Sequence, residues 1–217
     1  MVTGASDPRA MSLPEATQWV MRIGSDRLRF AWVEAGAAAL IDLALAGRID
    51  SLPNRGFFNQ EDQRRLIVTD STPLGVPELD RALELLVAHD KPRRIKRWIW
   101  DIGRAVSDIV RADAVAAGLA EEVGTFPNLT GHLRVIDDSR QRIAVEMLDT
   151  ARRQPGAVTD PRSGALVDLM RNGAPQFRGE GVRGAEIEHE WYPREARATV
   201  NGLLWAQRVR TASGGIY

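Results

Sequence analysis

The sequence predicts a mainly α-helical fold, organised as a single compact helical domain with a short β-hairpin. Between turn signals, most segments repeat their apolar residues with the period of an α-helix. A hydrophobic share of 44% is enough to fill one core. No internal repeat, low-complexity tract or strong linker divides the 217 residues. We therefore expect a flexible extension at residues 1–10, one domain at 11–210 and a frayed tail at 211–217.

The start of the domain predicts a helix followed by a short strand. Ser12 and Glu15 have the spacing of a capping box, and Pro14 suits the first turn. These signals predict a helix over residues 14–23. Residues 27–32 alternate apolar and polar side chains, which predicts a strand.

The middle of the chain is predicted to alternate helices with short strands. Residues 36–45 carry an apolar helical face that ends before Gly47, a residue type that commonly follows the last turn. An apolar strand then begins near Ile49, and residues 66–69 predict a second strand because they are rich in β-branched side chains. Residues 76–88 predict the next helix.

The second half is predicted to hold four more helices around the hairpin. Each helix begins at a proline or at a serine or aspartate that can cap its free N–H groups. The hairpin is predicted over residues 125–136, with its turn near residues 128–131. The predicted helices cover residues 92–120, with Gly103 as a possible break, and residues 139–153, 161–171 and 193–210.

Residue usage argues against several functional classes. The 29 basic and 29 acidic residues cancel, whereas nucleic-acid-binding proteins usually carry a basic surplus, so we expect no nucleic-acid partner. The absence of cysteine excludes disulfides and Cys-ligated metals and suits a reducing compartment. No apolar run reaches the ~20 residues that span a bilayer. We expect a cytoplasmic protein, with the cytoplasmic face of a membrane as its docking place.

Catalytic chemistry finds no support in the residue pattern. The three histidines are scattered, and neighbouring carboxylates such as Asp137 and Asp138 point in different directions. No set of side chains has the spacing of metal ligands. We expect a non-enzymatic protein with no metal and no cofactor.

The densest basic segment of the chain is residues 91–100. It begins a predicted helix on which Arg97, Arg104 and Arg111 are spaced by seven and so share a face. Arginine binds phosphate oxygens through two parallel donors, and tryptophan, also present in this segment, favours the membrane interface. Such a face suits phosphate head groups. The alternative is a solvated basic face beside core tryptophans.

Two motifs in sequence resemble the Golgi phosphoprotein 3 family. The first is LIDLALAGRI at residues 40–49, and the second is DSTPLGVPELDRAL at residues 70–83, about thirty residues further on. Three further segments are similar to the family in order and spacing, at residues 92–99, 160–169 and 203–206. The resemblance covers roughly residues 11–210.

The resemblance implies a mainly α-helical fold with a projecting hairpin used in self-association, here residues 125–136. It also implies a peripheral membrane protein that recognises phosphatidylinositol 4-phosphate. The partner expected from it is an anionic or phosphoinositide lipid.

The family binds the lipid phosphate with a Trp and an Arg near the first core helix and an Arg-x-x-Arg pair on a later helix. By resemblance, Arg104 stands at the first Arg of the pair and Ser107 at the second. Gly36 stands at the early Arg, and Arg27 stands at the early Trp, with Trp32 five residues on. The residues expected to bind lipid phosphate are Arg27, Trp32, Arg97, Arg104, Ser107 and Arg111.

The departures at Gly36 and Ser107 keep a second function open. The chain would then be a protein–protein interaction or adaptor module that has lost lipid recognition. Its partner would be the basic or aromatic tail of another protein.

Overall fold

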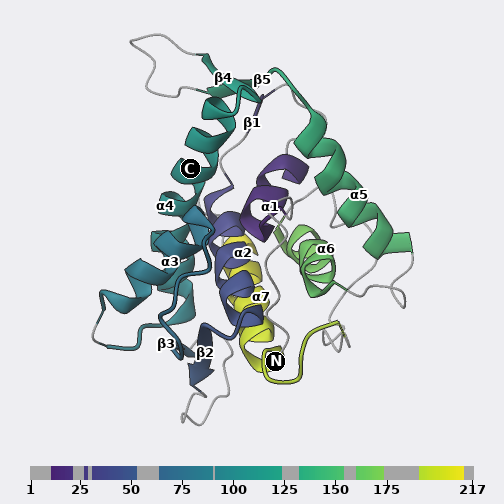
Figure 1. Ribbon diagram of the computed structural model, residues 1–217. Coiled ribbons are helices and arrows are strands. Elements are labelled where there is room, and N and C mark those ends of the chain that lie inside the picture. Colours follow the sequence, from purple (N-terminus) through teal and green to yellow (C-terminus); the bar gives the residue numbers. More distant parts are fainter. Residues whose placement is uncertain are drawn as a thin grey trace.

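The computed structural model describes residues 11–21, 27–28, 31–52, 64–89, 91–123, 132–153, 160–173 and 191–212. This part of the chain is mainly helical, as predicted (Figure 1). Its helices are α1 (Leu13–Met21), α2 (Trp32–Leu45), α3 (Pro77–Val87), α4 (Ile95–Ala116), α5 (Ser139–Arg153), α6 (Pro161–Gly173) and α7 (Arg197–Ala212). Its strands are β1 (Arg27–Leu28), β2 (Ile49–Leu52), β3 (Arg65–Val68), β4 (Ala120–Val123) and β5 (His132–Val135).

Helix α2 is the centre of the fold. It contacts α1, α3, α4, α6 and α7, and every residue from Val33 to Ala44 is buried. A helix that is apolar or small on all sides can be enclosed in this way. Figure 1 shows α4 on one side of α2 and α5 on the other. The buried apolar side chains form one cluster around this helix.

Helices α2 and α4 cross at two glycines. A Cβ at Gly36 would overlap the carbonyl oxygen of Ile99, and one at Gly103 would overlap that of Trp32. Helix α4 runs unbroken through Gly103, so the break proposed there is wrong. The glycine instead lets two backbones approach each other closely.

The two motifs of the sequence lie against each other. Gly47, at a φ of +69°, ends α2 as predicted, because the N–H of Arg48 can then donate to Leu43 O at 2.8 Å. The chain enters β2, which pairs antiparallel with β3. Arg48 also forms an ion pair with Asp70, and Thr69 N donates to Arg48 O at 2.9 Å. The glycine-arginine turn of the first motif therefore anchors the loop that opens the second.

The predicted hairpin is displaced toward the N-terminus. Strand β4 precedes the predicted range 125–136 and pairs with β5, which lies inside that range. The connection at residues 124–131, which holds the predicted turn, is outside the described residues. Strand β1 pairs with the other edge of β5, giving a three-stranded antiparallel sheet in the order β1-β5-β4.

The strand predicted over residues 27–32 is too long, because α2 begins at Trp32. The carbonyl of Ala31 already accepts a helical hydrogen bond from Ala35 at 2.8 Å. Trp32 packs against Trp100 of α4, a contact that the alternating pattern does not reveal.

The helix predicted over residues 92–120 is too long, because α4 ends at Ala116 and Ala120 begins β4. The helix predicted over residues 36–45 is too short, because α2 begins at Trp32.

Most other boundaries lie closer to the prediction. Helix α6 begins after Asp160, whose carboxylate accepts from the N–H groups of Arg162 at 3.1 Å and Ser163 at 3.3 Å, as an N-cap does. Helix α7 begins four residues later than predicted, after a turn at residues 193–196, and extends two residues into the predicted tail. The extension at residues 1–10 lies outside the described residues.

Candidate functional site

Arg104 is the central residue of the candidate site. Its side chain is exposed on α4, and within the described residues it has no ion pair or hydrogen bond. Charged side chains on a helix surface commonly pair with neighbours, and most arginines among the described residues have such a partner, whereas Arg104 has none. Its guanidinium is available to bind an anion with two parallel N–H donors.

Two tryptophans lie next to Arg104. Trp100 is one helical turn before Arg104 on the same face of α4. It packs edge-on against Trp32, the first residue of α2, with ring centroids 5.7 Å apart and planes at 90°. Both indoles are half-buried. The close α2–α4 crossing holds this pair in place, one helical turn before the exposed Arg104.

Ser107 lies inside the protein and not on this surface. Only 2% of it is exposed, and its hydroxyl accepts a hydrogen bond from Gln18 Nε2 at 2.9 Å. The contact links α1 to α4. Sequence reasoning missed Gln18, because nothing local indicates that a glutamine 89 positions earlier in the chain reaches this serine.

Arg97 and Arg111 lie on α4 on either side of Arg104, and each has an acidic partner. Arg97 is 3.4 Å from Asp101, and Arg111 is 2.8 Å from Glu122 of β4. Arg97 is 70% exposed and Arg111 is half-buried, and ion pairs that water reaches are worth ~1 kcal/mol or less. Exchange of such a partner for an incoming phosphate is therefore cheap.

The two remaining positions of the family site are Gly36 and Arg27. Gly36 is enclosed at the helix crossing, which leaves no space for a side chain. Arg27 lies in β1 opposite Arg134 of β5, and its side chain is outside the described part. Of the residues expected at the site, the structure therefore brings Trp32 and Arg104 together through Trp100.

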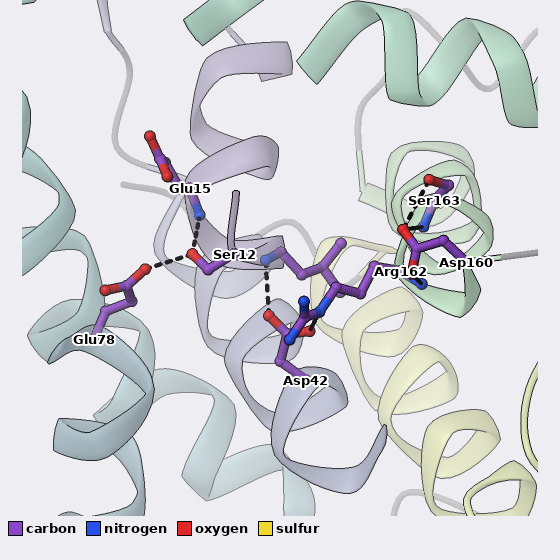
Figure 2. A network of polar contacts seen from close by, with 8 residues as sticks. Ser12, Glu15, Asp42, Glu78, Asp160, Arg162 and Ser163 are labelled. Carbon is purple, nitrogen blue, oxygen red and sulfur yellow. Dashed lines mark hydrogen bonds and ion pairs between the residues drawn. The ribbon is translucent and has the colours of Figure 1, made fainter. Parts of the chain in front are cut away.

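A second group of charged residues lies between the helices, at the N-terminus of α1 (Figure 2). Asp42 of α2 is fully buried and accepts from Leu13 N at 2.7 Å and from Arg162 Nε at 2.6 Å. Burial raises the pKa of Asp42, and Arg162 opposes this rise. Asp42 raises the pKa of Arg162 in return. The pair ties α1, α2 and α6 together.

The other half of this group joins α1 to α3. Ser12 accepts from Glu15 N at 3.2 Å, as the capping box predicts, and donates to the buried Glu78. Burial is the main cause that raises the pKa of Glu78. The carboxylate of Glu15 does not return to the helix end, because Arg140 of α5 holds it through two bonds of 2.7 Å. These contacts satisfy one another and support the fold.

The described part of the chain holds neither a cluster of metal ligands nor a helix that could span a membrane. No three His, Asp or Glu side chains there are arranged to hold a metal ion. No helix there combines the length and apolar character needed to cross a bilayer.

The comparison with known protein families agrees with the resemblance that the two sequence motifs indicate. The family model for Golgi phosphoprotein 3 (GPP34) matches residues 21–201. Among curated proteins, none matches this chain. The matched range includes both motifs and the α2–α4 crossing. It also includes Arg104, Trp100 and Trp32, which we call the Arg104 surface. The chain belongs to the Golgi phosphoprotein 3 (GPP34) family.

Proposed function

We propose that this protein is a non-enzymatic binding protein that docks reversibly on membranes containing phosphatidylinositol 4-phosphate or other anionic lipids. Arg104 holds the lipid phosphate, and the Trp32–Trp100 pair supports the head group. The lipid class comes from the family resemblance. The observation that carries the proposal is an exposed arginine with no partner among the described residues, beside a fixed pair of indoles.

The strength of binding follows from the few groups available. A hydrogen-bonded arginine–phosphate contact is worth about 1.5–3 kcal/mol. Arg97 and Arg111 can add to it by exchanging their acidic partners for lipid phosphates. The sum supports weak binding, which dimerisation through the β4–β5 hairpin would strengthen by avidity. Reversible docking is the behaviour that such a site allows.

The test is flotation of the purified protein with liposomes. Vesicles of neutral lipid alone, with phosphatidylserine, or with phosphatidylinositol 4-phosphate are compared for wild type and Arg104→Glu. The matched control is Arg142→Glu, an equally exposed change on α5, on the opposite side of α2 (Figure 1). The proposal expects stronger flotation on the phosphoinositide vesicles than on the phosphatidylserine vesicles. Arg104→Glu should lose this preference, and the control should retain it.

A second candidate function is an adaptor that binds a protein tail without lipid. Two observations favour it, namely that Ser107 is buried and engaged by Gln18 and that Gly36 has no space for a phosphate-binding side chain. If neither wild type nor Arg104→Glu floats with any vesicle, the lipid function is overturned and the adaptor function is favoured.

A further inference from the structure

Arginines from two distant segments meet at the start of α4. Backbone hydrogen bonds of 3.1 and 3.0 Å join β3 to the residues that lead into α4. They set Arg65 of β3 directly opposite Arg94, the residue before the helix. Like charges placed opposite each other across a strand pair destabilise it. This arrangement is therefore a cost that packing does not explain.

Further cations surround this pair. Both lysines of the chain, Lys91 and Lys96, lie in the same segment. Among the described residues, neither lysine has an ion-pair partner, and the same holds for Arg65 and Arg94. Arg97 follows one turn into the helix and is 70% exposed. The α4 basic edge is defined here as Arg65, Lys91, Arg94, Lys96 and Arg97.

Among the described residues, acidic compensation of this edge is small. Asp101 is shared between Arg97 at 3.4 Å and Arg93 at 3.5 Å. Arg93 is in addition held over the ring of Trp98, 5.5 Å from its centroid. One carboxylate therefore serves two arginines, and the described part of the chain offers no acidic partner to the other cations of the edge.

The surroundings of the edge favour a lipid surface as its partner. Leu52, which is 42% exposed, lies in register opposite Arg65, so an apolar side chain borders the cations. Arg97 and Arg104 are seven residues apart on one helix, which makes the edge continuous with the Arg104 surface. Because the whole chain has no net charge, attraction to an anionic bilayer requires a local concentration of cations.

We propose that the α4 basic edge is a second membrane contact, which binds anionic lipid by charge without regard to the head group. It rests on the proposed function and assigns the orientation of the docked protein: the start of α4 and β3 face the bilayer. Arg104 then selects the phosphorylated head group, while the basic edge provides attraction that any anionic lipid satisfies.

The test compares two double variants of equal charge. Arg65→Ala with Arg94→Ala removes two cations from the edge, and Arg142→Ala with Arg153→Ala removes two exposed cations from α5. Binding to phosphatidylserine vesicles is measured by flotation at low and high salt, with melting temperatures as a check on folding. A basic residue near such a surface contributes about fivefold, so the edge variant should bind roughly thirtyfold more weakly at low salt. The α5 variant should bind like wild type.

The outcomes separate this inference from the Arg104 site. Arg104→Glu should lose the preference for phosphatidylinositol 4-phosphate but keep the salt-sensitive binding to phosphatidylserine. If the edge variant binds phosphatidylserine as strongly as wild type or as the α5 variant, the inference is overturned while the Arg104 site stands. If wild type floats with no vesicle, both are overturned. If wild type binds no vesicle, and a labelled oligonucleotide binds wild type but not the edge variant, the edge is a nucleic-acid surface instead.

Discussion

Asp42 illustrates, at the scale of single residues, how the fold is held around its central helix. Its carboxylate is fully buried and meets one guanidinium and one backbone N–H. A buried ion pair adds little by itself, but removal of one partner leaves an uncompensated charge in the interior. The aspartate of the LIDLALAGRI motif is therefore tied to Arg162, 120 positions away.

Arg162→Met tests this dependence. We expect a loss of about 3–5 kcal/mol in the free energy of unfolding, because Asp42 remains buried without its partner. Urea denaturation measures the loss. Asp42→Asn in the same chain should recover part of it, and a loss below ~1 kcal/mol in the single variant would contradict the role of the pair.

Glu78 predicts a specific dependence of stability on pH. Burial, with Glu15 and Asp113 nearby, raises its folded-state pKa above the ordinary 4.5, and the Ser12 hydrogen bond opposes the rise. Above pH 4.5 the folded protein therefore holds this proton more tightly than the unfolded chain does. The contribution of Glu78 to stability then falls as the pH rises through its folded pKa.

The measurement compares wild type with Glu78→Gln by urea denaturation from pH 4.5 to 7. The difference in unfolding free energy should shift in favour of the variant as the pH rises. Taking the difference removes the opposite slopes of Asp70 and Asp137, whose pKa values are lowered by hydrogen bonds to Thr72 and Ser139. A difference that is constant with pH would show that Glu78 is not perturbed.

We predict that Ser107 stabilises the fold and takes no part in lipid binding. Ser107→Ala leaves the buried Gln18 amide without its acceptor and should cost about 1–3 kcal/mol in unfolding free energy. Flotation of this variant on phosphoinositide vesicles should equal that of wild type. A selective loss of flotation at unchanged stability would place Ser107 in the binding site after all.

At the scale of elements, the crossing of α2 and α4 places the candidate site. Two glycines without side chains bring the helix backbones together, and Trp32 thereby reaches Trp100. The position of the indole pair is a consequence of this contact.

Gly36→Ala and Gly103→Ala test the crossing. Each added methyl meets a carbonyl group of the other helix, so we expect losses of about 1–3 kcal/mol or more in unfolding free energy. Gly202→Ala in α7 is the control, because its nearest neighbours, at 3.1 and 3.2 Å, are flexible ends of Arg64 and Ile95. Calorimetric melting should leave the control near wild type; equal melting of all three variants would contradict the close approach.

Sequence predicts elements well where the signal is local. Asp160 caps α6, Gly47 ends α2, and α3 forms within the predicted range 76–88, with Leu79, Leu83 and Leu86 on its buried side. Errors arose where a distant partner decides the outcome. In the sequence, Gly103 suggests a possible break, because the helix that crosses there is not visible in its own segment.

The residues of the candidate site divide in the same way, into those that local sequence places and those that depend on a distant partner. The helical period places Arg97, Arg104 and Arg111 along α4 without any structure. The engagement of Ser107 by α1 and the enclosure of Gly36 require the packed helices. Neither could be read from spacing along the chain.

At the scale of the whole molecule, the neutral net charge conceals an uneven distribution. The α4 basic edge lies at the start of the helix, the Arg104 surface lies in its middle, and the β4–β5 pair follows its end. Helix α4 thus aligns these three features along one side of α2 (Figure 1). This alignment is what a single docking face requires.

The most direct measurement is a calorimetric titration of the protein with short-chain phosphatidylinositol 4-phosphate, for wild type and Arg104→Gln. A soluble lipid removes avidity and general surface charge, so the titration reports the phosphate site alone. We expect saturable binding to wild type and at least tenfold weaker binding to the variant, as loss of one charged hydrogen-bonding contact implies. Equal binding by the variant, or no binding by wild type, would contradict phosphate recognition at Arg104.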